Sequence, residues 1–172
     1  MPETTPRLAL VVSQFNTEVT HGLRDGALAY LAENGVALSP ADIYSAPGAF
    51  ELPLIAKRLA ESGYDGVICL GCVIKGDTAH FEYISEAAAH GLMQAGLETG
   101  KPLTFGILTT YTDEQAIMRS RPDEHNKGRE AAAACVETLK TIGVAPPVKN
   151  VAGQSRGCAL PFDSGGRIGV FP

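Results

Sequence analysis

The residues best suited to chemistry gather in one segment near the middle of the chain. Gly71-Cys72-Val73-Ile74-Lys75-Gly76-Asp77-Thr78-Ala79-His80 combines glycines with a carboxylate, a hydroxyl and an imidazole. A glycine-bounded turn between a strand and a helix leaves main-chain N–H groups free to bind an anion, which predicts a monophosphate held by Gly76, Asp77 and Thr78. Asp77 stands where a nucleotide-binding P-loop needs lysine, so we do not expect triphosphate hydrolysis.

His80 lies one turn inside the helix that should follow this segment. An imidazole titrates near neutral pH, so His80 is a candidate for moving protons. The alternative is that His80 is an ordinary solvated side chain of a helix. The sequence by itself favours that simpler interpretation.

A second segment, Ala46-Pro47-Gly48-Ala49-Phe50-Glu51-Leu52-Pro53, places small residues just before a predicted helix. Small residues allow a ligand to approach the backbone. Glu51 opens the helix, where a carboxylate is stabilising by about 0.3–1 kcal/mol, so it could serve only as a capping charge. The functional alternative is that Glu51 accepts hydrogen bonds from the hydroxyl groups of a polyol.

A third segment, Ser13-Gln14-Phe15-Asn16, follows a buried strand. Phe15 has no further strand in which to pack, so its ring could stack on a flat heterocycle. Equally, Phe15 could cover the edge of the sheet. The sequence leaves both interpretations open.

The elements that must position these segments alternate between strand and helix patterns. We predict strands at residues 8–12, 42–46, 66–70 and 103–108. We predict helices from an N-cap at Asn16 to Gly35, from Glu51 to Gly63, and over residues 81–97, 113–119 and 127–142. The first strand is apolar throughout, which is typical of a strand buried on both faces. The pattern therefore indicates an α/β three-layer sandwich with a four-stranded parallel, flavodoxin-like sheet, whose ligands bind at the carboxyl ends of the strands.

The composition indicates one globular domain over residues 1–143, followed by a Gly/Pro-rich tail at 144–172 that we expect to be extended or partly disordered. The chain of 172 residues is 45% hydrophobic and carries a net charge of −5 without a long run of one sign. We therefore expect small-molecule or protein partners and no nucleic acid or membrane. No apolar stretch is long enough to span a bilayer, and the first residues do not resemble a signal peptide, so we expect a cytoplasmic protein.

Four cysteines, Cys69, Cys72, Cys135 and Cys158, are irregularly spaced, which favours reduced thiols. Cys69 and Cys72 form a C-x-x-C pattern. On a strand, however, residues three apart have Cα atoms about 10 Å apart, beyond the reach of a disulfide. We therefore interpret both as core residues rather than as a redox or zinc site.

Taken together, the segments resemble the 6,7-dimethyl-8-ribityllumazine synthase family over about residues 7–143. The matching stretches are residues 13–16, 47–53 and 71–81, with Phe105-Gly106-Ile107-Leu108-Thr109-Thr110 and Asn126-Lys127-Gly128. Each is weak alone, but their shared order makes the resemblance specific.

The resemblance implies condensation of 5-amino-6-ribitylaminouracil with 3,4-dihydroxy-2-butanone 4-phosphate, with no metal or other cofactor. It implies that Phe15 stacks on the pyrimidine, while Asn16, Glu51 and the backbone at Ala49 and Phe50 hold the ribityl chain. Val73 and Ile74 would line the ring pocket, and His80 would move protons. Gly76, Asp77, Thr78 and Arg119 would bind the phosphate. In the family, the partner chain supplies Phe105, Arg119 and Lys127, so the resemblance also implies a homopentamer.

Two departures from the family affect these expectations. The stretch from Arg119 to His125 lacks the glycine-rich bend of many capsid-forming members, and its Arg121 competes with Arg119 for the phosphate. Only six residues precede Arg7, too few for the N-terminal strand that many members add to a neighbour. We therefore expect a pentamer or a pair of pentamers rather than an icosahedral shell. The rival functions are a related small riboflavin synthase and a non-catalytic flavin- or lumazine-binding paralogue.

Overall fold

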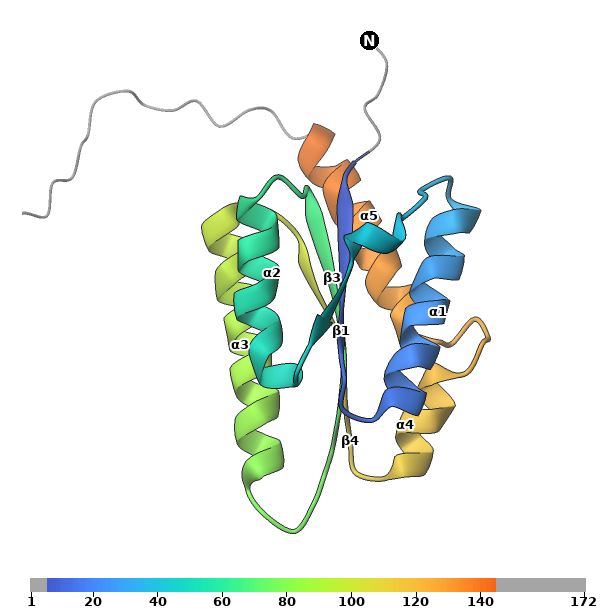
Figure 1. Ribbon diagram of the computed structural model, residues 1–172, viewed down its shortest axis with the longest axis vertical. Coiled ribbons are helices and arrows are strands. Elements are labelled where there is room, and N and C mark those ends of the chain that lie inside the picture. The colour runs from blue at the N-terminus through green and yellow to red at the C-terminus, as the bar shows by residue number, and fades with distance from the viewer. Residues whose placement is uncertain (1–5, 145–172) are drawn as a thin grey trace, which may run out of the picture.

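The computed structural model describes residues 6–144, which form a four-stranded parallel sheet between two layers of helices (Figure 1). The strands are β1 (Leu8–Ser13), β2 (Ile43–Ala46), β3 (Gly66–Ile74) and β4 (Leu103–Thr110), in the order β2-β1-β3-β4. This arrangement confirms the predicted flavodoxin-like α/β fold. The predicted tail lies outside the described residues, except that Val144 is the last residue of a helix.

Helices cover both faces of the sheet, as the continuous apolar strands require. On one face lie α1 (Thr17–Glu33), α4 (Asp113–Ser120) and α5 (Lys127–Val144), and on the other lie α2 (Leu52–Glu61) and α3 (His80–Thr99). Two short 3₁₀ helices, η1 (Pro40–Asp42) and η2 (Ala49–Glu51), flank β2. Each face buries its own apolar cluster, so the core consists of two layers separated by the sheet.

The strands β3 and β4 extend further than their apolar runs predict. Residues 72–74 pair with residues 108–110, and the N–H of Lys75 donates to the carbonyl of Thr110 at 2.9 Å. The loop between β3 and α3 is therefore confined to Lys75–Ala79, whereas the predicted strand and helix left residues 71–80 for it. Gly71 lies inside β3, where an added Cβ would be 3.3 Å from Ile107 and Leu52, so this glycine permits close packing and does not form a turn.

Other element boundaries differ from the predicted ones by one or two residues. Strand β1 extends one residue beyond the prediction, to Ser13, and Asp42 belongs to η1 rather than to β2. Helix α3 ends at Thr99 and is followed by the C-cap residue Gly100, which adopts a left-handed conformation with φ 66°. The helix therefore runs two residues past its predicted end at residue 97.

The C-x-x-C pair is part of the core, as predicted. Cys69 belongs to the cluster beneath α2 and α3, whereas Cys72 belongs to the cluster beneath α1 and α5. Both thiols are free and buried, as is that of Cys135. Burial raises the pKa of Cys72 to about 11, so this thiol stays protonated at neutral pH.

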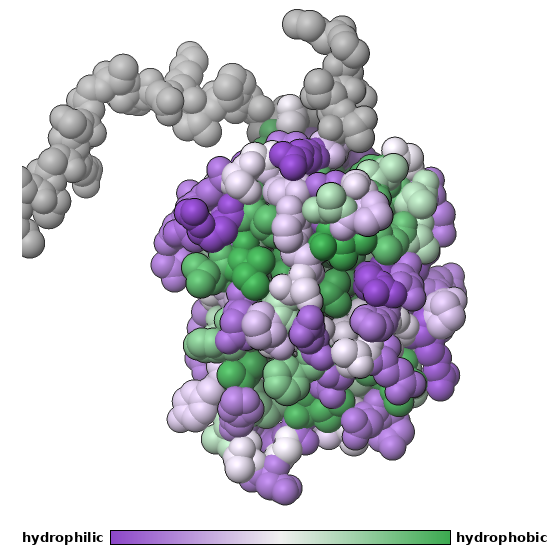
Figure 2. All heavy atoms as spheres, viewed as in Figure 1, coloured by the Kyte–Doolittle hydropathy of each residue, from purple (hydrophilic) through white to green (hydrophobic). Residues whose placement is uncertain are grey.

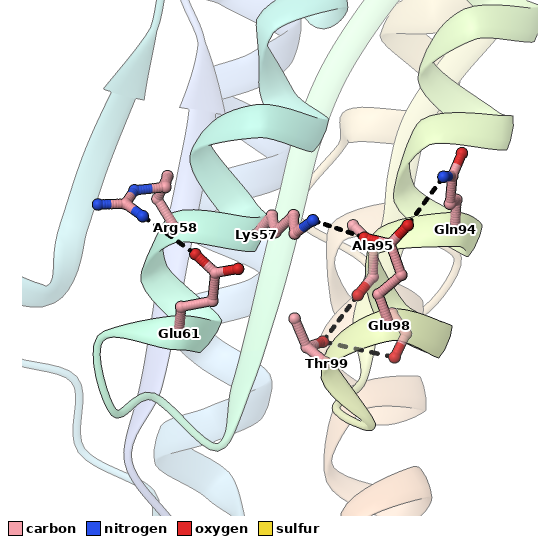
Figure 3. Close-up of polar contacts among 8 residues, drawn as sticks. Lys57, Arg58, Glu61, Gln94, Ala95, Glu98 and Thr99 are labelled. Atoms are coloured by element: carbon pink, nitrogen blue, oxygen red, sulfur yellow. Dashed lines mark hydrogen bonds and ion pairs between the residues drawn. The ribbon is translucent and has the colours of Figure 1, made fainter. Parts of the chain in front are cut away.

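The layer of α2 and α3 is connected by an ion pair that Figure 3 shows in detail. Lys57 Nζ of α2 lies 2.5 Å from Glu98 Oε2 of α3, and Gln94 Nε2 donates to the other oxygen of Glu98 at 2.8 Å. Arg58 and Glu61 form a second pair within α2 at 3.2 Å. The Lys57–Glu98 pair thus connects the middle of α2 with the last turn of α3 at the surface of this layer.

Polar and apolar residues intermix on the surface that faces the viewer in Figure 2. Among the helices of residues 6–144, none combines the length and the apolar character that a membrane span requires.

Candidate functional site

The carboxyl ends of β1, β2 and β3 bring together the segments that the sequence singled out, at the lower end of the molecule in Figure 1. Gly48, just after β2, is where two of them meet. A Cβ added to Gly48 would lie 3.0 Å from Glu51 Oε2 and 3.5 Å from the ring of Phe15. The phenyl ring and the carboxylate therefore border the same small space, which a larger residue at position 48 would fill.

Glu51 occupies the N-cap position of α2, but its side chain makes no capping hydrogen bond. Within residues 6–144, the carboxylate makes no hydrogen bond or ion pair at all. The Glu51 side chain therefore does not cap α2 by a hydrogen bond, and both of its oxygens are available to a ligand with hydroxyl groups.

Two aromatic rings near Gly48 are open to solvent. Phe15 is 68% exposed and Phe50 is 58% exposed. The exposure of Phe15 argues against the alternative that it covers the edge of the sheet, because a covering ring would be largely buried. Ala49, between these segments, is buried and supplies backbone rather than side-chain surface.

The sequence predicts that the side chain of Asn16 caps the N-terminus of α1, and the structure gives this side chain a different partner. Its backbone is left-handed, with φ 54°, and its side chain does not cap α1. Instead, its Nδ2 donates to the carbonyl of Cys72 at 3.1 Å. One of the two amide hydrogens is thus committed to the protein, and the other, with Oδ1, is left for a ligand.

Val73 and Ile74 lie on β3 and are half-buried. Val73 packs on the cluster beneath α2 and α3, whereas Ile74 packs on the cluster beneath α1 and α5. Because side chains alternate along a strand, these two side chains point to opposite faces of the sheet.

The loop Lys75–Ala79 and His80 are all exposed. Thr78 Oγ1 accepts from the N–H of His80 at 3.4 Å, whereas Ala79, at the N-cap position of α3, has no side chain that can cap the helix. A Cβ on Gly76 would meet nothing within 4 Å. The loop is thus open to solvent and ends at a helix N-terminus, where an anion is favoured.

Lys75 is a feature of this loop that the sequence reasoning left without a role. Its ammonium pairs with Glu82 and lies 5.5 Å from the centroid of the Phe81 ring and 5.9 Å from that of Tyr111. The hydrogen bond between the two charges raises the pKa of Lys75 and lowers that of Glu82. Lys75 therefore ties the end of β3 to the start of α3, and its charge is already partnered.

The remaining predicted residues line a separate pocket of about 390 Å³ beside β4, the edge strand. Phe105, Arg119 and Lys127 all border it, and Arg121 does not. Within one chain, the predicted site residues thus form two groups: one at the carboxyl ends of β1 to β3, and one in this β4 pocket.

The basic residues of the β4 pocket are held by neighbouring groups. Arg119 Nη1 donates to the carbonyl of Gln115 at 2.9 Å, and Lys127 Nζ contacts both oxygens of Glu130 at 2.7 and 2.8 Å. Glu130 also borders the pocket. The sequence reasoning missed Glu130, although its i,i+3 spacing from Lys127 on a predicted helix is a usable signal.

An α/β fold with exposed aromatic and imidazole side chains and a half-buried carboxylate at the carboxyl edge of a parallel sheet defines a flavodoxin-like enzyme with a small-molecule site. The family model described as 6,7-dimethyl-8-ribityllumazine synthase matches residues 5–142, and the chain belongs to this family.

Relatives of the same name support this assignment. The chain is 64% identical over 138 residues to 6,7-dimethyl-8-ribityllumazine synthase 1 of Caulobacter vibrioides, a match that covers 80% of this chain and 90% of that protein. It is 49% identical to the synthase of Nitratidesulfovibrio vulgaris strain DP4 and 48% identical to that of Desulfotalea psychrophila, in each case over 79% of this chain and 88% of the relative.

Proposed function

We propose that this chain is the transferase of riboflavin biosynthesis that condenses 5-amino-6-ribitylaminouracil with 3,4-dihydroxy-2-butanone 4-phosphate. The products are 6,7-dimethyl-8-ribityllumazine, phosphate and water. The family match over residues 5–142 carries this proposal. The uncommitted carboxylate of Glu51 beside the exposed ring of Phe15 agrees with it.

The ribitylaminouracil binds at the ends of β1 and β2. The exposed ring of Phe15 stacks on the pyrimidine, since a flat heterocycle fits a free aromatic face. Glu51 accepts hydrogen bonds from the ribityl hydroxyls, and Asn16 contributes the amide hydrogen that Cys72 does not use. The backbone of Ala49 and Phe50 supplies further polar groups along the ribityl chain.

The butanone phosphate binds against the loop after β3. Main-chain N–H groups of Gly76, Asp77 and Thr78 hold the phosphate near the start of α3. Imine formation, phosphate loss and ring closure all move protons, and the exposed imidazole of His80 is the group that moves them. Both reactants are intrinsically reactive, so holding them together supplies much of the acceleration.

The two groups of site residues combine between neighbouring subunits. The β4 pocket of one subunit brings Phe105, Arg119 and Lys127 to the open carboxyl edge of the sheet in the neighbouring subunit. Val73 and the loop that contains Gly76, both from that neighbouring subunit, lie opposite these three residues. A head-to-tail contact of this kind closes into a ring. We therefore propose a pentamer or a pair of pentamers, for which light scattering would report about five or ten chains of 18.0 kDa.

The test is turnover with both substrates, followed by the absorbance of the lumazine product. The proposal predicts lumazine formation with one phosphate released per product. A small riboflavin synthase would instead consume lumazine without phosphate release, and a non-catalytic paralogue would bind lumazine without forming it. Either of those results would replace the proposal.

A further inference from the structure

Asn126 is the buried centre of a hydrogen-bond network that joins three helices. Its side chain is fully buried, with 0% relative exposure. Nδ2 lies 3.0 Å from the carbonyl of Gly22 in α1, 2.9 Å from that of Ser120 and 2.8 Å from that of Arg121. Oδ1 accepts from the N–H groups of Gly128 and Arg129 at 2.8 and 3.2 Å.

The surrounding backbone is shaped to receive this amide. A Cβ on Gly26 would lie 2.1 Å from Asn126 Oδ1, and one on Gly22 would lie 2.4 Å from the carbonyl oxygen of Ser120. A Cβ on Gly128 would lie 1.9 Å from the carbonyl oxygen of Leu23. These three glycines let α1 approach the junction of α4 and α5 closely, so the position of the amide is tightly constrained.

The two elements that this amide joins carry the cations of the β4 pocket. Arg119 directly precedes Ser120, whose carbonyl accepts from Asn126, and Lys127 directly follows Asn126. Among residues 121–126, Asn126 alone is buried. The distance between Arg119 and Lys127 thus depends on one buried residue, Asn126, whereas residues 121–125 of the connecting segment are exposed to solvent.

We infer that Asn126 is a positioning residue for the phosphate-bearing substrate, acting through Arg119 and Lys127. This inference rests on the proposed function. An amide suits the role because it donates and accepts at once: the α5 N-terminus requires an acceptor, and three carbonyls require a donor. A carboxylate of the same shape caps the helix but places an oxygen against three carbonyl oxygens.

The experiment compares Asn126→Ser and Asn126→Asp with the wild type. Both replacements keep an acceptor that can cap α5. Asn126→Asp removes the donor altogether, whereas Asn126→Ser replaces the amide N–H₂ by one hydroxyl donor on a shorter side chain. The expected result is an increase of about tenfold or more in the KM for the butanone phosphate, with less than about a threefold change for the pyrimidine. Inorganic phosphate should also inhibit the variants more weakly than the wild type.

The control is Tyr64→Phe, which removes a buried hydroxyl far from the β4 pocket. Tyr64 is 2% exposed, and its hydroxyl contacts Tyr44 and Asp42 at 2.7 Å each, at the opposite end of the sheet. This variant should lower the melting temperature without separating the two KM values. It therefore shows how the two KM values respond when only the stability of the fold is reduced.

The outcomes separate this inference from the proposed function. If the wild type forms no lumazine from the two substrates, the proposed function fails. If the wild type turns over and both Asn126 variants change the two KM values equally, as Tyr64→Phe does, the positioning role is wrong. If Asn126→Asp does not fold, Asn126→Ser decides the matter by the same measurements.

Discussion

The side-chain amide of Asn16 donates a hydrogen bond of 3.1 Å to the main-chain carbonyl of Cys72. This contact joins the turn after β1 to the strand β3 across 56 residues of sequence. Asn16 is also the one non-glycine residue among positions 6–144 with a positive φ. Asparagine tolerates that conformation better than most residues, so one side chain serves both the backbone and the contact.

Replacement of Asn16 separates these two contributions. Asn16→Gly removes the hydrogen bond but keeps a residue that adopts positive φ, whereas Asn16→Ala removes both. We expect the alanine variant to lose more free energy of unfolding than the glycine variant, by about 0.5–1 kcal/mol. Urea denaturation measures the difference. Equal losses would show that the left-handed backbone costs alanine nothing here.

His80 carries the proposed proton transfers, and its exposed place at the start of α3 leaves little for it to stabilise. We expect His80→Ala to lower kcat by about ten- to a thousandfold while the KM values change little, because substrate positioning survives. His90, on the same helix and also exposed, provides the matched control. A rate for His80→Ala equal to that of His90→Ala would remove His80 from the mechanism.

Arg119 and Arg121 differ in what surrounds them. Arg119 borders the β4 pocket with Lys127, whereas Arg121 does not border it. We expect Arg119→Ala to raise the KM for the butanone phosphate far more than that for the pyrimidine, because a charge-assisted contact to phosphate is lost. Steady-state kinetics with each substrate varied in turn provides the measurement. The same pattern in Arg121→Ala, and not in Arg119→Ala, would reverse the assignment.

Sequence reasoning found the strands because their apolar runs are continuous, and it missed where two of them end. Ile74 and Thr110 are paired with one another at the end of β3 and β4. Nothing local to Gly71 shows that its chain continues as a strand, since the pairing partner lies in a distant segment. Pairing with β4 therefore determines where β3 ends, although a glycine at position 71 by itself favours a turn.

The site residues likewise divide into those that sequence motifs reveal and those that depend on tertiary contacts. Motifs singled out Phe15, Glu51 and His80 because aromatic, carboxylate and imidazole groups near predicted strand ends are visible in sequence. The network of Asn126 was not visible, because its contact with Gly22 spans 104 residues. Likewise, the pairing of Lys75 with Glu82 depends on how α3 leaves the loop, which no local pattern specifies.

The Lys57–Glu98 pair makes the stability of the α2–α3 layer depend on pH (Figure 3). Its hydrogen bond lowers the pKa of Glu98 below 4.5 and raises that of Lys57 above 10.5. A carboxyl with a depressed pKa stabilises the fold above its unfolded pKa and loses that contribution as pH falls. A lysine with a raised pKa stabilises below its unfolded pKa and loses its contribution as pH rises. The pair therefore contributes fully between these two values.

Glu98→Gln should accordingly lower the melting temperature at pH 7, and the difference from the wild type should shrink as the pH falls below 4.5. Calorimetry at pH 7 and pH 3.5 measures both differences under the same salt. Glu61→Gln is the matched control, because its partner Arg58 lies on the same helix and joins no second element. Added salt should also reduce the effect of Glu98→Gln, since both charges are partly exposed. A Glu98→Gln difference that stays constant from pH 7 to pH 3.5 would mean that packing of the side chain, and not its charge, stabilises the contact between α2 and α3.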